Sequence, residues 1–275
     1  MIDLSYEHHI AIRKDRLCPF KLSHIENTYA CVCNWHKNIE VILITEGEGT
    51  VTYGSQELSF SRGDIIVVNS GVLHRLYSES GIDYYYMIVD EVFCKENGID
   101  IERRQFTPLF RSDRVSELLF DAVKTVGCYQ EKGDDGFNMR ASKARLSVLA
   151  LLVELCESHS TGTASCQGIA KPSEDYVKRV ISYMAEHYSE SHSLESLAAI
   201  CGVNKCHLAR EFRRYTGQTV MTYLNTLRCK NAESLIAGGM SVTAAAYECG
   251  FGSLSYFSRT YKRLIGSLPS LTLRR

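Results

Sequence analysis

Residues 193–202 read SLESLAAICG and residues 241–250 read SVTAAAYECG, so the chain contains one short pattern twice. A second segment follows each copy, LAREFRR over 208–214 and FSRTYKR over 257–263, and a glycine, Gly217 or Gly266, comes three residues after its end. A helix, a glycine turn and a second helix with one apolar and one basic side are typical of helix-turn-helix motifs, which place the second helix in the major groove of DNA. The repeat predicts two such units, at about 193–217 and 241–266.

The second helix of each unit has an apolar side and an outward side. Helical spacing predicts an outward stripe of Cys206, Ala209, Arg210 and Arg213 in the first unit and of Ser255, Ser258, Arg259 and Lys262 in the second. The planar guanidinium group donates two parallel hydrogen bonds to guanine, so Arg210 and Arg259 are the expected base contacts. Arg214 and Arg263 point further round and are expected at phosphates. A single basic face also suits an ordinary solvated helix, and it is the repeat that favours DNA.

Charge is divided unevenly along the chain. The whole chain has a net charge of −1, but residues 171–275 hold 14 Lys/Arg and 8 Asp/Glu, a balance of +6. The first 170 residues hold the remaining 17 basic and 24 acidic side chains, a balance of −7. A polyanion-binding domain joined to a non-binding domain would show this asymmetry, although chance variation between two ordinary domains also produces it.

The first half of the chain has the patterns of short strands followed by helices. Strands are expected at about 39–44, 50–53, 57–60, 64–68 and 83–89, and Gly54-Ser55 predicts a hairpin. Strands at this spacing favour a β-sandwich or a small barrel. Ser112 is expected to cap one helix, and another is expected at about 138–158 with apolar residues on two faces. Either one chain covers both faces or one face meets a second copy, so these helices are candidates for dimerisation.

These patterns predict an α+β chain of two domains. The N-terminal domain spans residues 1–160, a linker rich in serine, threonine and glycine spans 161–173, and an all-helical domain spans 174–275. Ser173 is expected to cap the first helix of the helical domain. Another helix, which carries Tyr223 and Leu227 and ends at Gly238, joins the two helix-turn-helix units. Such a rigid connection would hold two reading helices about 34 Å apart, in successive major grooves.

Residues 174–275 resemble the DNA-binding domain of the AraC/XylS family of bacterial transcription regulators. The matching positions are Leu197-Ala198, Gly217, Tyr223-Leu224, Arg228, Ala232, Leu235, Gly250-Phe251, Ser255-Tyr256-Phe257-Ser258-Arg259, Lys262, Gly266 and Pro269. The resemblance implies base reading by Cys206, Ala209 and Arg210 in the first unit and by Leu254, Ser255, Ser258 and Arg259 in the second. Two segments, 252–254 and 270–274, depart from the family pattern, which leaves the bases that are read open. The implied partners are double-stranded promoter DNA, RNA polymerase and a second copy of the chain, and the expected role is that of an activator.

The N-terminal domain resembles the cupin-like sensor domain that many such regulators carry. WHxxxExxxxxxG over 35–47 matches the first cupin motif, and GD at 63–64 with NSGVLH over 69–74 matches the second. In metal-binding cupins, histidines and a glutamate surround a divalent ion. Asn34 stands where the first histidine of that set should be, which leaves His36, Glu40 and His74. Three ligands could still form a triad with open positions, so a metal-dependent enzyme or a metal sensor is the alternative interpretation.

The favoured interpretation is a metal-free pocket for a small polar effector such as a sugar, without a cofactor. The candidate effector-binding residues are Trp35, His36, Glu40, His74 and Arg75. No nucleophile–base motif or phosphate-binding loop indicates catalysis, so the chain is not expected to be an enzyme. The 11 cysteines are scattered, several of them within expected helices, and no signal-peptide pattern starts the chain. No apolar run approaches the roughly 18 residues that span a bilayer. The sequence therefore predicts a cytoplasmic regulator that binds DNA.

Overall fold

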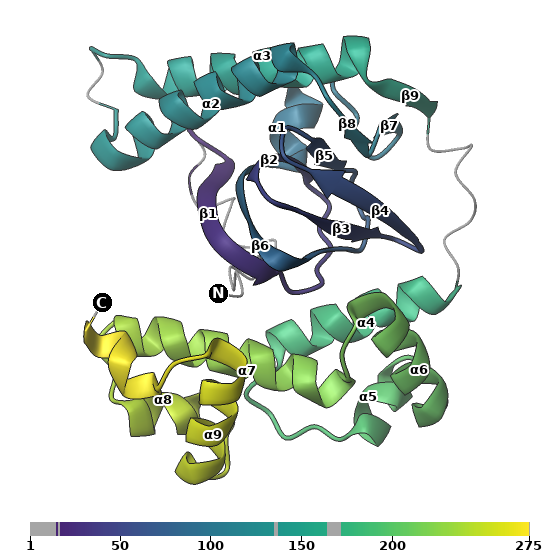
Figure 1. Cartoon of the computed structure of the whole chain (residues 1–275), viewed down its shortest axis with the longest axis vertical. Coiled ribbons are helices and arrows are strands. Elements are labelled where there is room, and N and C mark those ends of the chain that lie inside the picture. Colours follow the sequence, from purple (N-terminus) through teal and green to yellow (C-terminus); the bar gives the residue numbers. More distant parts are fainter. Residues whose placement is uncertain (1–14, 16, 135–136, 164–171, 275) are drawn as a thin grey trace. The chain divides into compact units, whose positions relative to one another are not determined.

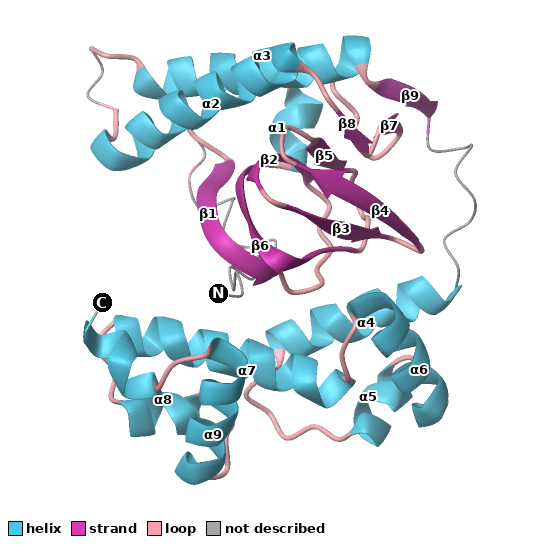
Figure 2. Ribbon diagram, viewed as in Figure 1, coloured by secondary structure: helices cyan, strands magenta, loops and turns pink. Residues whose placement is uncertain are grey.

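The structure is a computed structural model that describes residues 15, 17–134, 137–163 and 172–274. Within these residues the chain forms two compact units, an N-terminal one with strands and helices and a C-terminal one made of helices (Figure 2). The expected α+β fold with two domains is confirmed. Residues 164–171, most of the expected linker, lie outside the described residues. No helix among the described residues is long and apolar enough to cross a membrane.

A bent antiparallel sheet of seven strands forms the centre of the N-terminal unit (Figure 1). Its strands run in the order β4-β3-β6-β2-β5-β8, and β1 also pairs with β6. Their bounds are β1 (Phe20–Ala30), β2 (Ile39–Glu46), β3 (Glu48–Tyr53), β4 (Gln56–Ser61), β5 (Ile65–Val68), β6 (His74–Val89) and β8 (Leu109–Phe110). A smaller sheet pairs β7 (Arg104–Phe106) with β9 (Ser160–Thr163). Residues 161–163 fall within the predicted linker but form part of β9, because β7 satisfies their backbone hydrogen bonds.

Strand β2 is buried on both of its faces. Ile39, Val41 and Leu43 belong to a core shared with the helices of this unit. Alternate residues point to the opposite face, where Glu40 is buried in the same row as Ile42. Burial on both faces explains why the strand is a continuous apolar run, and it makes Glu40 the exception in that run.

The hairpin expected at Gly54-Ser55 is confirmed, since Tyr53 pairs with Gln56 across it. Gly54 has a φ of +57°, as a two-residue hairpin turn requires. The sequence patterns missed β1, the first half of β6 and helix α1 (Glu91–Glu96). These segments mix polar and apolar residues without a clear period. The strands become regular because β1 and β6 satisfy each other's backbone over a long register, and α1 begins where the Asp90 side chain caps it.

Two long helices, α2 (Asp113–Lys132) and α3 (Arg140–Ser158), lie side by side against one face of the sheet (Figure 1). Ser112 accepts a hydrogen bond from the backbone of Val115 and caps α2 as predicted. One face of α3 packs into the core of this unit through Val148, Leu151, Leu152 and Leu155. On its other face Leu146 remains 69% exposed, so the N-terminal unit by itself covers only one of the two apolar faces.

The C-terminal unit consists of helices joined by short turns. Their bounds are α4 (Pro172–Glu186), α5 (Leu194–Ile200), α6 (Lys205–Thr216), α7 (Val220–Ala237), α8 (Val242–Glu248), α9 (Leu254–Ile265) and the 3₁₀ helix η3 (Pro269–Arg274). The prediction that Ser173 caps the first of these is wrong, because α4 already begins at Pro172. Proline suits the first turn of a helix, where its missing N–H removes no hydrogen bond.

Candidate DNA-binding interface and sensor-domain sites

The two helix-turn-helix units begin and end on equivalent residues. Ser193 caps α5, where it exchanges side chain-to-backbone hydrogen bonds with Ser196, and Ser241 caps α8 by accepting from Ala244. The second helices are capped by Asn204 and Ser253. Their C-caps are the two glycines of the sequence pattern, both in the left-handed region with φ of +73° and +84°. The repeat is therefore a repeat of backbone geometry as well as of residue types.

Helix α7 supplies apolar side chains to both units. Tyr223 meets Phe212 of the first unit edge to face, with 5.4 Å between ring centroids. Further along α7, Ala232 and Ile236 lie in the core of the second unit with Phe257 and Tyr261 of α9. A helix buried along its length between two cores fixes their separation, as the connecting-helix prediction requires.

The outward faces of α6 and α9 carry the residues predicted to meet DNA. Exposed side chains are Cys206, Arg210, Arg213 and Arg214 on α6, and Ser255, Arg259 and Lys262 on α9. Ala209, Ser258 and Leu254 are half-buried, and Leu254 packs against the core of the second unit. The structure thus places the charged residues of the expected stripes at the surface, whereas Leu254 is partly occupied in the core.

A row of hydrogen bonds joins Arg210 to His207 and Tyr176, and the sequence pattern did not predict it. Arg210 Nη2 lies 2.8 Å from His207 Nδ1, and His207 Nε2 lies 2.5 Å from the hydroxyl of Tyr176 on α4. A guanidinium group only donates, so His207 Nδ1 accepts and Nε2 carries the ring hydrogen. Nearly buried Glu211 contacts Arg210 at 3.4 Å and Arg214 at 2.7 Å. The i, i+3 spacing of His207 and Arg210 is the signal that could have indicated their contact, but Tyr176 is far away in sequence.

Three of the five predicted effector residues come together in the N-terminal unit. His36, Glu40 and His74 are all buried, and one ligand atom from each lies within 4.8 Å of the others. The Nε2 atoms of His36 and His74 lie 3.1 Å and 3.2 Å from the same oxygen, Glu40 Oε2. The Nδ1 atoms face backbone carbonyls instead, at 3.0 Å from Asn38 and at 3.0 Å from Val72. We refer to these three side chains as the His–Glu–His cluster.

The electrostatics of the His–Glu–His cluster keep Glu40 ionised. Burial by itself would raise the pKa of the Glu40 carboxyl group, but hydrogen bonds from the two histidines and their charge hold it at about 2. Burial disfavours the charged form of His74, yet its contact with Glu40 is the stronger influence and raises its pKa. A carboxylate therefore sits inside the sheet domain between two imidazole rings.

The structure does not bring Arg75 into this cluster. His74 and Arg75 are successive residues of β6 and point to opposite faces of the sheet. Arg75 lies over the ring of Tyr77 at 5.9 Å, whereas His74 is buried. Trp35 is half-buried beside His36 in the sequence. In place of the mouth expected from these five residues, the structure has a buried cluster of three, with Arg75 on the other face of the sheet.

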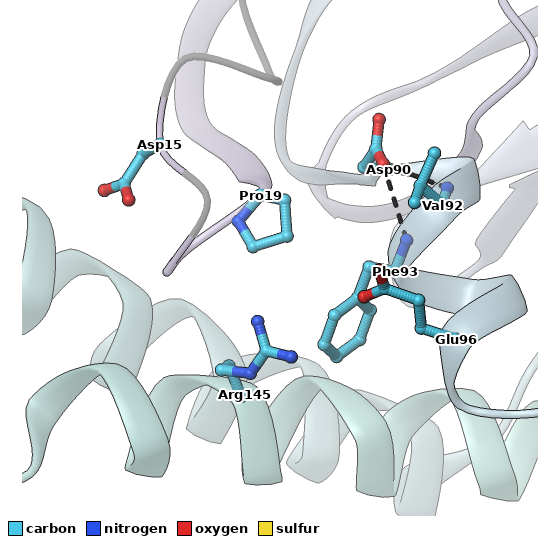
Figure 3. Close-up of a pocket in the computed structure, with 7 residues that line it drawn as sticks. All are labelled: Asp15, Pro19, Asp90, Val92, Phe93, Glu96 and Arg145. Atoms are coloured by element: carbon cyan, nitrogen blue, oxygen red, sulfur yellow. Dashed lines mark hydrogen bonds between the residues drawn. The ribbon is translucent and has the colours of Figure 1, made fainter.

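A separate cavity of about 430 Å³ lies in the N-terminal unit between the segment before β1, helix α1 and helix α3 (Figure 3). Its lining residues are Asp15, Pro19, Asp90, Val92, Phe93, Glu96 and Arg145. The Arg145 guanidinium group lies 4.8 Å from the centre of the Phe93 ring, and Asp90 caps α1. This volume is in the range of small-molecule pockets. Its residues come from distant parts of the chain, and for this reason no sequence pattern indicated it.

Two capped helix-turn-helix units in one domain, together with a bent sheet and a buried polar cluster in another, define a class of protein, the two-domain DNA-binding transcription regulators. A family model described as an AraC-like ligand binding domain matches residues 22–149, and one described as a helix-turn-helix domain matches residues 197–275. Together the two matches cover most of the chain. The chain belongs to the AraC family of transcription regulators.

Relatives across the chain are regulators as well. The chain is 26% identical over 225 residues to the uncharacterized HTH-type transcriptional regulator YbfI of Bacillus subtilis, covering 81% of this chain and 80% of that protein. It is 24% identical to the HTH-type transcriptional activator RhaS of Salmonella paratyphi B, covering 83% and 82%. A crystal structure of an apo variant of ToxT from Vibrio cholerae is similar in fold, with a TM-score of 0.52, 14% identity and coverage of 93% and 97%.

Proposed function

We propose that this AraC-family regulator reads two successive major-groove segments of promoter DNA, with α6 in one and α9 in the other. The observation that carries this proposal is that α6 and α9 have equivalent caps and each expose a basic face. Helix α7, which is buried between the two units, holds these helices at a fixed separation. Arg210 and Arg259 would contact bases, and Arg213, Arg214 and Lys262 would contact phosphates. The balance of +6 in residues 171–275 supports the second role, since phosphate contacts depend on positive charge.

A small molecule bound to the N-terminal unit would control this activity. The family model for residues 22–149 describes a ligand-binding domain, which supports an effector without naming it. A small polar molecule such as a sugar is the class that we propose to test first. Two candidate sites would be tested, the His–Glu–His cluster, which contains three of the predicted effector residues, and the cavity lined by Arg145. Effector binding would change how the DNA-binding units of a dimer are presented, as a coupling between sites and not as catalysis.

Dimerisation would use the exposed face of α3. Leu146 and Val153, seven residues apart on this helix, are 69% and 42% exposed. These two residues form an apolar surface two turns long, while the rest of α3 packs on the sheet. The same surface of α3 in a second copy of the chain could pack against it. A dimer would present four reading helices to a promoter with repeated sites, where the regulator would also meet RNA polymerase.

The test measures DNA binding by the full-length protein. Double-stranded sites are first selected from a random library, and the affinity for a selected site and for an unrelated duplex is then measured by fluorescence anisotropy. Arg210→Ala and Arg259→Ala should each weaken the selected site by about 1–3 kcal/mol and change the unrelated duplex little. Affinity for both duplexes should fall steeply between about 50 and 200 mM salt.

The control is Arg103→Ala, which removes an exposed arginine from the N-terminal unit. It should leave both affinities unchanged. Failure to select any sequence, or an affinity that does not depend on salt, would contradict the proposal. Equal weakening of both duplexes by Arg210→Ala would move Arg210 from the base contacts to the phosphate contacts.

A further inference from the structure

Helix α4, the first helix of the C-terminal unit, contacts the DNA-facing helix α6 through polar side chains at two points (Figure 1). The hydroxyl of Tyr176 lies 2.5 Å from His207 Nε2. One turn earlier on α4, Ser173 Oγ accepts a hydrogen bond from Arg214 Nη2 at 3.3 Å. Tyr176 is buried, whereas Arg214 is exposed on the face of α6 that we propose to meet DNA. A helix behind α6 therefore reaches side chains that belong to its outward face.

Tyr176 supports the form of His207 that Arg210 requires. His207 Nδ1 accepts a hydrogen bond from Arg210 Nη2 at 2.8 Å, so the ring hydrogen is on Nε2. The oxygen of Tyr176 accepts that hydrogen. In a neutral histidine, the hydrogen bond made by one ring nitrogen sets which nitrogen is protonated. Loss of the Tyr176 oxygen would remove the acceptor of Nε2–H and favour the tautomer protonated on Nδ1, which cannot accept from Arg210.

The second unit has a similar arrangement made of different residues. Tyr256 and Arg259 of α9 stand 49 positions after His207 and Arg210, so they are their equivalents in the repeat. The hydroxyl of Tyr256 accepts a hydrogen bond from Asn225 Nδ2 of α7 at 3.0 Å. Helix α7 precedes the second unit as α4 precedes the first. In each unit, therefore, a preceding helix holds the residue that lies one turn before the arginine.

We propose that Tyr176 is a positioning residue for base reading by α6, because it holds His207 in the tautomer that orients Arg210. The inference rests on the proposed function, in which Arg210 contacts a base. Tyr176 is buried on α4 and acts through His207, so its influence is confined to the base pairs that Arg210 reads. The first reading unit thus consists of three helices, α4, α5 and α6.

The experiment measures base discrimination by the full-length protein. Each base pair of a selected site is substituted in turn, and competition anisotropy gives the ratio of affinities for the selected and the substituted duplex. Tyr176→Phe should weaken the selected site about two- to fivefold, the effect of one lost hydrogen bond. It should relax discrimination at the base pairs where Arg210→Ala relaxes it, and leave discrimination unchanged where Arg259→Ala relaxes it. In the Arg210→Ala background, Tyr176→Phe should have no further effect.

The matched control is Tyr183→Phe, which removes a hydroxyl from the same helix two turns later, where Tyr183 stacks on His187. It should discriminate bases like the wild type. Nitrogen NMR of full-length protein labelled at histidine reports the tautomer directly, with the His207 signals assigned by their loss in His207→Asn. We expect the hydrogen on Nε2 in the wild type, and this measurement decides the question even if Tyr176→Phe does not fold.

The proposal is overturned if wild-type His207 carries its hydrogen on Nδ1. It is also overturned if folded Tyr176→Phe discriminates bases like the wild type while Arg210→Ala does not. Equal relaxation at every base pair would overturn it as well, because a general loosening of the unit would act on the whole site. If Arg210→Ala itself leaves discrimination unchanged, the proposed base contact fails and the inference fails with it, so the two failures are distinguished.

Discussion

Neighbouring side chains hold Arg210, the base contact that we propose for α6, in place. Its contacts to His207 and Glu211 limit the rotamers of a side chain that is otherwise 71% exposed. An arginine that is already oriented loses less conformational entropy when it binds a base. Arg259 occupies the corresponding position in α9, where Ser258 and Lys262 are its neighbours on the outward face. The two units therefore differ in how firmly they orient the arginine that we propose as a base contact.

We predict that His207→Gln weakens binding to a selected DNA site about two- to fivefold, because the variant loses the Nδ1 acceptor that orients Arg210. His207→Asn places an oxygen near the position of Nδ1 and should retain most of the affinity. Anisotropy titrations of both variants against the same duplex provide the measurement. In the Arg210→Ala background, His207→Gln should have no further effect. An equal loss in that background would show that His207 acts independently of Arg210.

Asp64 ties the turn between β4 and β5 to the segment after β8. Its carboxylate accepts hydrogen bonds from the backbone of Ser61 at 2.7 Å and from Arg111 Nε at 2.6 Å. Burial would raise the pKa of Asp64, but the bonds from Arg111 and Ser61 are the stronger influence and lower it. A lowered pKa in the folded state means that this stability is fully present above about pH 4, the unfolded value, and is lost as the pH falls through the folded pKa.

Asp64→Asn should therefore lower the free energy of unfolding by on the order of 1 kcal/mol at neutral pH, with the difference from wild type shrinking below about pH 4. Urea denaturation over a pH series measures this. Asp100→Asn, which removes an exposed partner of Arg103, should change stability little at any pH. A difference for Asp64→Asn that stays constant down to acid pH would exclude the charge as its cause.

At the scale of elements, the two glycine turns are similar in sequence but differ in their surroundings. Gly202 and Gly250 both have a positive φ, +66° and +81°. A Cβ on Gly202 would meet nothing within 4 Å, whereas a Cβ on Gly250 would overlap the backbone carbonyl of Ser189. Arg228 of α7 holds this carbonyl segment by donating to the carbonyl oxygens of Tyr188 at 2.7 Å and Glu190 at 2.6 Å. Only the turn at Gly250 therefore packs closely against a loop, residues 188–190, that hydrogen bonds hold in place.

Gly202→Ala should cost about 1–2 kcal/mol, which is the penalty of a left-handed conformation for a residue with a Cβ. Gly250→Ala should cost clearly more, because the clash with the Ser189 carbonyl adds to the same penalty. Chemical denaturation of the two variants compares them directly, and Gly252→Ala, at a position with a negative φ and open space, is the control. Equal costs for Gly202→Ala and Gly250→Ala would show that the loop around Ser189 yields.

At the scale of the whole molecule, the exposed face of α3 governs the oligomeric state in our proposal. Leu146→Glu should weaken dimerisation by about 1–2 kcal/mol or more, because a charge would be buried in an apolar contact. Sedimentation of the full-length protein over a range of concentrations measures the shift toward monomers. Leu268→Glu, at an exposed leucine of the C-terminal unit, should leave the dimer intact. Wild-type protein that is monomeric throughout would contradict the proposal.

The sequence alone identified the features that depend on short spacings. Serine caps, glycines after helices and apolar residues three or four apart are signals within one or two helical turns, and they located both helix-turn-helix units and the exposed arginines Arg210 and Arg259. The hairpin at Gly54 was equally local. Each of these signals depends on backbone geometry that neighbouring residues determine among themselves.

The tertiary structure decided which distant side chains meet. Strand alternation separates Arg75 from His74, and the sheet places His74 against Glu40 although 34 positions separate them in the sequence. The contact of Tyr176 with His207 and the clash that only Gly250 avoids likewise depend on packing between elements. Such contacts follow from strand register and helix packing, which sum over many weak interactions and leave no periodic signal in the chain.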